Sequence, residues 1–150
     1  MRAEQAMTRN VVCVKPDDTA AEALEIMQEW SIRHLPVVEN DQLVGILSDR
    51  DLVRIDLDAA VSEYMTEGPI TCSTTTSLAA AAETMLAEKI DCLPVLDNDE
   101  DLAGLITVSD FLELVIEREQ MMLSRPIPFS FHLFRSVRPG MKSSLVGSAS

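Results

Sequence analysis

Two stretches of the chain are near-copies: HLPVVENDQLVGILSDRD at residues 34–51 and CLPVLDNDEDLAGLITVSD at residues 92–110. Each has an apolar Leu-Pro segment, a polar turn, a second apolar segment with a glycine, and a hydroxyl residue three positions before an aspartate. The second copy is one residue longer, and the extra residue falls in the polar turn, where an insertion costs little. Apolar runs that flank a polar turn predict a β-hairpin in each copy, from residues 35–38 and 43–47 and from residues 93–96 and 102–106.

The repetition extends toward the N-terminus of both stretches. Met7-Thr8 recurs as Met65-Thr66, and Met27 recurs as Met85, with a constant spacing of 58 residues. A register kept over about forty positions indicates an internal duplication. We therefore predict a first repeat with its lead-in at residues 1–60, a second repeat at residues 61–123, and a tail at residues 124–150.

Each repeat has the pattern strand, helix, strand, strand, helix. The first strands are expected at residues 11–14 and 70–72, and the first helices begin at Thr19 and Ser77, which are typical N-cap residues. The second helices begin at Ser48 and Thr107, and the latter reaches about Met122. The predicted fold is α/β (α+β), with two β-α-β-β-α repeats packed about a pseudo-twofold axis, because neither repeat is large enough to close a core alone.

Proline lacks the backbone donor that a β-ladder uses. Pro36 and Pro94 are therefore expected at strand starts or sheet edges, where free backbone groups beside them would face a ligand.

The charge of the chain disfavours nucleic acid as a partner. The 150 residues carry 25 acidic and 12 basic side chains, a net charge of -13, which repels a phosphate backbone. No apolar run approaches the roughly 18 residues of a spanning helix, and the first ten residues lack the apolar stretch of a signal peptide. We expect a cytoplasmic protein without a membrane partner. Its three cysteines, which form no CxxC pair, are expected to be reduced core thiols: Cys13, Cys72 and Cys92.

The tail differs in composition from the rest of the chain. Residues 124–150 hold four basic side chains, no acidic one and three of the four phenylalanines. A flexible end is the first interpretation. The alternative is a segment that folds onto its own module, a second copy, a partner or an anionic surface.

The motif Gly-x-x-Ser/Thr-x-x-Asp is the candidate binding element. It occurs as Gly45, Ser48 and Asp51, and again as Gly104, Thr107 and Asp110. A hydroxyl at a helix start can bond a phosphate or ribose oxygen, and the carboxylate can accept both hydrogen bonds from a ribose diol. The same spacing is also a plain capping box, so both interpretations stay open.

These motifs resemble the cystathionine β-synthase (CBS) domain, which occurs in tandem as a Bateman module. The resemblance rests on AMT and YMT before the first strands, on HLPVV and CLPVL, and on GILSDRD and GLITVSD, and it covers about residues 6–122. It implies a regulatory rather than catalytic protein that binds AMP, ADP, ATP or S-adenosylmethionine between its repeats and forms a homodimer. No cofactor is required.

The resemblance also implies two clefts, each drawing residues from both repeats. The first would join Ile32, Arg33 and His34, beside Cys13, with Thr107, Ser109 and Asp110. The second would join Thr71, Cys92, Ile90 and Asp91 with Ser48 and Asp51, with Arg50 as a minor candidate. The first cleft is favoured, because Arg33 and His34 can offset phosphate charge whereas Asp91 stands at the matching place of the second. A lone histidine such as His34 is also typical of a partly buried structural residue.

Two classes of function remain after the sequence is read. The first is a nucleotide-binding regulatory module that signals to a partner protein. The second is a ligand-independent dimerisation or scaffold module whose motifs only cap helices. An enzyme is disfavoured, because the sequence offers no nucleophile paired with a base, no phosphate loop of the GxxxxGK[ST] type and no spacing typical of a metal site.

Overall fold

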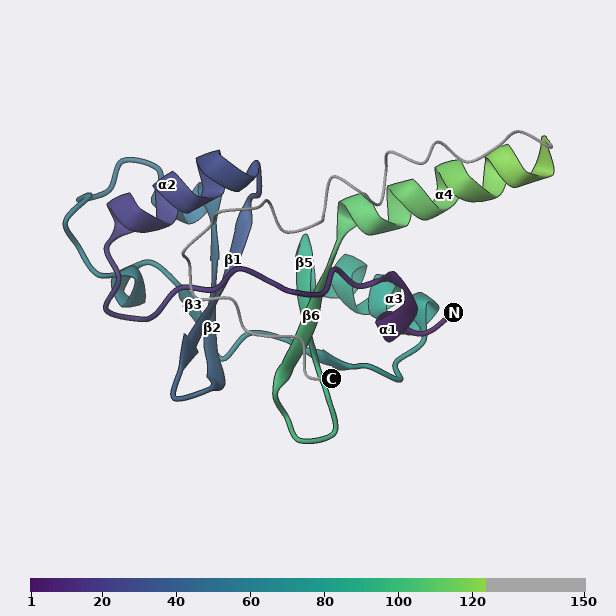
Figure 1. Cartoon of the computed structure of the whole chain (residues 1–150), viewed down its shortest axis with the longest axis horizontal. Coiled ribbons are helices and arrows are strands. Elements are labelled where there is room, and N and C mark those ends of the chain that lie inside the picture. Colours follow the sequence, from purple (N-terminus) through teal and green to yellow (C-terminus); the bar gives the residue numbers. More distant parts are fainter. Residues whose placement is uncertain (124–150) are drawn as a thin grey trace.

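The computed structural model describes residues 1–123, so the predictions made for residues 124–150 lie outside the described part of the chain. Two three-stranded sheets lie side by side, each built around the hairpin of one repeat (Figure 1). Their strand orders are β1-β2-β3 and β4-β5-β6. The predicted α/β architecture with two related halves is confirmed.

Each repeat contains the predicted helix and hairpin. In the first repeat these are α2 (Ala20–Trp30), β1 (His34–Glu39) and β2 (Gln42–Ser48). In the second they are α3 (Leu78–Glu88), β5 (Cys92–Leu96) and β6 (Leu102–Thr107). Both helices start at the predicted caps, because the Thr19 and Ser77 hydroxyls each accept a backbone N–H from three residues later, at 3.1 Å.

The turns explain why the repeats differ in length. The β1–β2 turn places Asn40 and Asp41 at φ 50° and 63°, the left-handed pair that a two-residue hairpin requires. In the longer β5–β6 turn, the Asp97 carboxylate accepts the backbone N–H groups of Asp99 and Asp101 at 2.9 and 3.0 Å. The extra residue is thus absorbed by an aspartate-centred loop.

Two predicted elements are shorter than expected. The expected strand at residues 11–14 forms isolated bridges only, such as the parallel bridge from Val14 to Val37, and its counterpart β4 (Cys72–Ser73) pairs only two residues with β5. The expected second helix of the first repeat is a four-residue 3₁₀ helix, η1 (Asp49–Leu52). Its counterpart α4 (Val108–Met122) has the predicted length and projects away from the body (Figure 1).

The expectation of a sheet edge is confirmed for Pro36, since β1 is an edge strand of its sheet, but it is wrong for Pro94, and the expected free backbone groups beside Pro36 are not found. Strand β5 lies between β4 and β6, so Pro94 is not at a sheet edge. The carbonyl of Pro36 accepts the Val14 N–H at 3.0 Å, and both prolines are fully buried. The backbone beside them is therefore covered by the chain itself.

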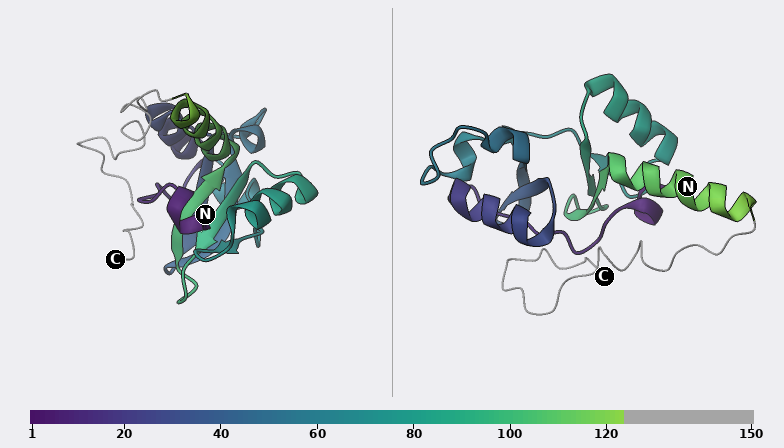
Figure 2. Two further views of the ribbon diagram at one scale, coloured as in Figure 1. Left: turned by 90° about the vertical axis from the view of Figure 1, so that its right-hand side faces the viewer. Right: turned by 90° about the horizontal axis from the view of Figure 1, so that it is seen from above.

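Short lead-in segments are exchanged between the repeats, which the sequence did not reveal. The N-terminal segment with α1 (Ala3–Ala6) lies against α3 and β6 of the second repeat (Figures 1 and 2). The segment with η2 (Val61–Glu63) and β3 (Thr66–Glu67) lies against the first repeat. The two contacts are equivalent in the repeat register, since Thr8 bridges Leu105 as Thr66 pairs with Ile46.

The exchanged segments account for the two motif glycines. A Cβ on Gly104 would lie 2.6 Å from the Thr8 carbonyl oxygen and 2.7 Å from Met7 Sδ. A Cβ on Gly45 would lie 2.6 Å from Met65 Sδ. Each glycine is needed because a lead-in segment crosses its strand at close range.

Three clusters of buried side chains form the core. One belongs to the first repeat and includes Val61 of the second lead-in, and another belongs to the second repeat and includes Ala3 and Met7 of the first lead-in. The third joins the repeats, and we call it the inter-repeat cluster: Val11, Cys13, Cys92, Leu102 and Leu105. Each half therefore has its own core, and the halves share the inter-repeat cluster.

Candidate functional site

The two predicted motifs form the same hydrogen-bonded arrangement at the starts of η1 and α4. Asp51 Oδ2 accepts the Ser48 N–H at 2.7 Å and the Ser48 hydroxyl at 3.0 Å. Asp110 Oδ2 accepts the Thr107 N–H at 2.6 Å and its hydroxyl at 3.2 Å. Both aspartates therefore hold a helix start, as the capping interpretation requires. Since a carboxylate can accept about four hydrogen bonds, this role is compatible with a ligand contact.

Burial distinguishes the two aspartates. Asp110 is 4% exposed and is the one buried charged residue among residues 1–123, whereas Asp51 is half-buried. A buried carboxylate is costly unless it is hydrogen-bonded, so the Thr107 contacts are a condition for Asp110 to lie there.

The segments before the two Leu-Pro motifs lie beside the helix starts of their own repeats. The Arg33 carbonyl accepts the Asp49 N–H at 2.9 Å, and the Asp91 carbonyl accepts the Val108 N–H at 3.2 Å. Across the hairpins, His34 pairs with Ser48 and Cys92 pairs with Thr107. This places the predicted cleft residues at one end of the sheets.

An ion pair links the two repeats at this end. Arg50 Nη2 lies 3.4 Å from Asp91 Oδ2, with side chains 82% and 50% exposed. Both residues belong to the second predicted cleft, one from each repeat. The sequence analysis did not predict this ion pair. The opposite charges of Arg50 and Asp91, which were both assigned to the second cleft, could have indicated it.

His34 lies within the field of this ion pair. Burial lowers the pKa of His34 below its ordinary value of 6.5, partly offset by the carboxylates of Asp49 and Asp91. Arg33 and Arg50 lower it further. The lowered pKa favours the uncharged imidazole in the ligand-free chain, and the role of His34 in offsetting phosphate charge stays a prediction.

Other predicted residues serve packing. Cys13 and Cys92 are buried in the inter-repeat cluster, where burial raises the pKa of Cys92 to about 12, so its thiol stays neutral. Ile32 and Ile90 pack on the cores of their own repeats. Thr71 is half-buried, and Arg33 and Ser109 are exposed.

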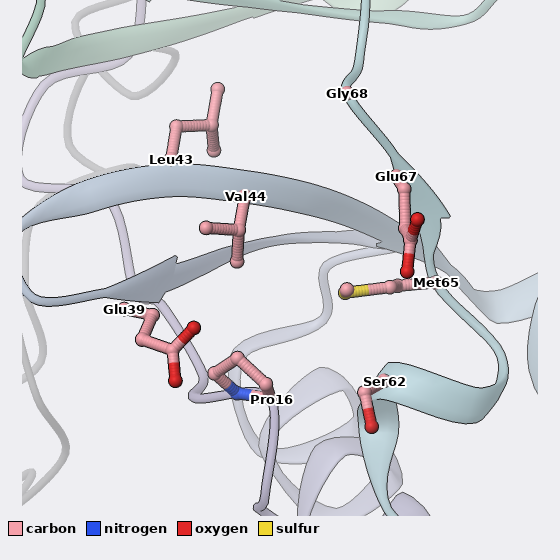
Figure 3. Close-up of a pocket in the computed structure, with 8 residues that line it drawn as sticks. All are labelled: Pro16, Glu39, Leu43, Val44, Ser62, Met65, Glu67 and Gly68. Carbon is pink, nitrogen blue, oxygen red and sulfur yellow. The ribbon is translucent and has the colours of Figure 1, made fainter.

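A separate hollow of about 540 Å³ lies between the first repeat and the lead-in of the second (Figure 3). Val44, Met65 and Pro16 face one another across it, and Glu39 and Glu67 stand at its rim (Figure 3). It shares no residue with either predicted cleft. Its two carboxylates would repel a phosphate group, so it is not the predicted nucleotide site.

Neither a membrane span nor a metal cluster is found in the described part of the chain. No helix within residues 1–123 is long and apolar enough to cross a bilayer. The same residues hold no group of three or more His, Cys, Asp or Glu side chains placed to ligate a metal ion.

The fold and the paired helix starts define a tandem-repeat module of the Bateman class. The family model for the CBS domain matches twice, at residues 3–58 and 61–117. The chain belongs to the CBS domain family.

Solved structures share this fold. CBSX2, a CBS-pair protein from Arabidopsis thaliana, has been crystallised in complex with AMP, and that structure is 30% identical with a TM-score of 0.73. It covers 79% of this chain and 98% of its own. The CBS domain pair of protein MJ0100 has the same fold at 23% identity, with a TM-score of 0.73 and coverage of 79% and 98%.

The chain is also similar to part of a larger enzyme. Inosine-5'-monophosphate dehydrogenase from Methanocaldococcus jannaschii is 37% identical over 114 residues, and the enzyme from Aquifex aeolicus is 40% identical over 117 residues. These matches cover 75% of this chain but 23% and 24% of the enzymes. The chain thus spans about a quarter of the length of the dehydrogenases that it matches.

Proposed function

We propose that this chain is a regulatory module that binds an adenosine nucleotide between its two repeats. The observation that carries the proposal is the start of α4, where a buried, hydrogen-bonded Asp110 and the Thr107 hydroxyl hold the N-terminus of a 15-residue helix. Such a helix end favours an anion, and a fixed carboxylate beside it suits a ribose diol. The complex of CBSX2 with AMP supports an adenosine ligand.

Regulation would work through the shared core. Helix α4 begins where β6 ends, and β6 contributes Leu102 and Leu105 to the inter-repeat cluster. A ligand held at the start of α4 would therefore act on the contact between the repeats. By linkage, a partner protein that senses this contact and the nucleotide would change each other's affinity by the same factor.

A thermal-shift panel of AMP, ADP, ATP, S-adenosylmethionine and adenosine tests the proposal. A nucleotide at about 100 times its Kd should add roughly 2.7 kcal/mol of stability. Unmoved melting curves with all five compounds would favour the ligand-independent alternative.

Asp110→Ala separates ligand binding from capping. If Asp110 contacts ribose, the loss of binding free energy in this variant should exceed its loss of folding free energy. Equal losses would support capping alone. Asp51→Ala is the matched control at the other helix start. Its aspartate makes the same pair of hydrogen bonds but lies at η1.

We also propose that the module forms a homodimer through α4. Asp110 is its only buried residue, and large apolar side chains stand exposed along one face: Val108, Leu112, Val115, Ile116 and Met122. Their recurrence every three or four residues forms a stripe that a second copy of α4 can cover.

Leu112→Glu with Val115→Lys should convert a dimer into a monomer in light scattering. Glu113→Ala, on another part of the helix surface, is the control, and a monomeric parent chain would refute the dimer.

A further inference from the structure

The hollow in Figure 3 is built by a strand irregularity and an exchanged lead-in. The register between β1 and β2 skips Val44, so this residue is a β-bulge, whose side chain is redirected. The lead-in of the second repeat closes the other side, where the Gly68 N–H donates to the Val44 carbonyl at 3.2 Å. Val44, Pro16 and Met65 are all half-buried, and together they form an apolar floor (Figure 3).

The rim of this hollow carries two carboxylates that the described part of the chain does not neutralise. Glu39 ends β1 and Glu67 ends β3, and both are exposed. Within residues 1–123, neither side chain has an ion pair or a hydrogen bond, and no lysine or arginine of that range lines the hollow. An apolar floor between two carboxylates suits an occupant that combines cations with apolar surface, as an arginine beside an aromatic residue does.

The equivalent place in the second repeat has a different chemistry. The counterparts of Pro16, Val44 and Glu67 in the repeat register are Thr74, Ala103 and Arg9. Ala103 is the bulge residue of β6, as Val44 is of β2, but its side chain is smaller. A basic residue replaces one of the two carboxylates, so the acidic rim with an apolar floor is a feature of the first repeat.

The chain itself carries a segment of complementary chemistry. All 25 acidic side chains lie within residues 1–123, whereas residues 124–150 carry four basic side chains and no acidic one. In this tail, the run FRSVR at residues 134–138 has one phenylalanine and two arginines within five positions. The aromatic ring can cover the apolar floor, while the two guanidinium groups pair with the carboxylates at the rim.

The tail is long enough to reach the hollow in its own chain. Extended at about 3.3 Å per residue, the 15 residues after Leu123 span about 50 Å and end at Arg138. This reach allows the tail to run back along the roughly 22 Å of α4 and to cross most of a compact domain of 123 residues, about 35 Å in diameter. Because the tail is tethered, its effective concentration is of about millimolar order, so a weak contact is sufficient for docking.

We propose that residues 134–138 dock in this hollow of their own chain, with the phenylalanine on the apolar floor and the two arginines paired with Glu39 and Glu67. The tail then connects the end of α4, in the second repeat, to the hairpin of the first. This inference goes beyond the proposed function, because it concerns another surface and requires no nucleotide.

Limited trypsin digestion of the full chain, followed by mass spectrometry, tests the docking. The measured quantity is the cleavage rate of the Arg135–Ser136 bond, divided by its rate in a synthetic peptide of residues 129–143 that carries the same substitution. Since trypsin cuts only the undocked segment, this ratio gives the undocked fraction, and a segment docked nine-tenths of the time is cut about tenfold more slowly than the peptide.

Variants on both sides of the contact test the occupant. Glu39→Gln with Glu67→Gln should raise the ratio roughly three- to tenfold, the size of two exposed ion pairs. Phe134→Ser should raise it as well, because it removes the apolar part of the contact. Neither change adds a trypsin site.

The matched control for the carboxylates is Glu83→Gln with Glu88→Gln. These two residues are exposed on α3 and lie outside the hollow, and their substitution changes the net charge by the same amount. Since surface charges beyond a Debye length are screened at physiological salt, this control should change the ratio less than about twofold. Melting curves of both variants will confirm that they fold.

Each contrary outcome assigns the tail elsewhere. Equal cleavage of the chain and the peptide, or equal effects of the two glutamine variants, would overturn docking in the hollow. Release by Leu112→Glu with Val115→Lys alone would place the tail on α4. Protection that disappears on dilution would place it on a second copy, and either result would overturn the intramolecular site. None of these outcomes bears on nucleotide binding, so the proposed function stands or fails separately.

Discussion

Gly104 shows how a binding motif can contain a residue kept for packing. Its missing Cβ leaves room for the backbone of the first lead-in, because the Thr8 carbonyl oxygen would lie 2.6 Å from that atom. We expect Gly104→Ala to lower the free energy of unfolding by about 1–3 kcal/mol, as overpacking does. Gly45→Ala should cost less, since its shortest contact is to the flexible Met65 Sδ and the nearest backbone oxygen is 3.0 Å away. Urea unfolding of both variants gives the order, and a larger loss for Gly45→Ala would contradict this account.

His34 makes stability depend on pH. Burial, only partly offset by Asp49 and Asp91, lowers its pKa in the folded state, so the unfolded chain binds the proton more readily as pH falls below 6.5. The stability from a neutral His34 is therefore complete above that pH and is lost as pH falls toward the folded-state pKa. Urea unfolding from pH 7.5 to 5.5 should show this decline, and His34→Gln should flatten it. The same slope in both proteins would assign the decline to other groups.

At the scale of elements, the exchanged lead-ins tie each repeat to the start of the other. Met7 belongs by sequence to the first repeat but packs in the core cluster of the second, where Thr8 and Leu105 bond each other's backbone at 2.8 and 3.1 Å. Met7→Ala should therefore speed hydrogen exchange at the Leu105 amide more than at Ile46. Met65→Ala, its counterpart on the first repeat, should do the reverse. Exchange that rises equally at both amides in both variants would be inconsistent with separate docking sites for the lead-ins.

The elements also show which parts of the fold a single sequence can predict. The hairpins and the caps at Thr19 and Ser77 were predictable, since their signals are local: an apolar period, a polar turn and a hydroxyl before a helix. The lead-in exchange was not, because which sheet a short segment joins is decided by contacts distant in sequence. The length of the helix after Ser48 was not predictable either. It ends after four residues, although the sequence at its start resembles that of α4.

The candidate site, like the fold, could be predicted from the sequence only in part. The motif spacing located both aspartates and their hydroxyl partners, but it left both capping and ligand binding open. Periodicity reports neighbours along one element, whereas the Arg50–Asp91 ion pair joins two repeats and depends on how they pack. The burial that keeps His34 neutral likewise follows from tertiary packing.

At the scale of the whole molecule, the two repeats should unfold together. Each repeat completes its core with the other's lead-in, and the inter-repeat cluster adds buried contacts that neither half has alone.

Two probes can follow the halves separately. Trp30 packs on the first core, so its fluorescence reports on the first repeat, while the buried thiol of Cys92, in the second repeat, reports on the inter-repeat cluster. In the folded chain this thiol is neutral and covered, so it should react with a thiol reagent only after unfolding. We expect the urea midpoints of fluorescence and thiol labelling to coincide. Leu105→Ala, which truncates a buried cluster residue, should lower both midpoints together, because it reduces the free energy of unfolding by about 2–5 kcal/mol. Separate midpoints, or a loss confined to one probe, would mean that the halves fold as independent domains, and a ligand at the start of α4 would then have no shared core through which to act.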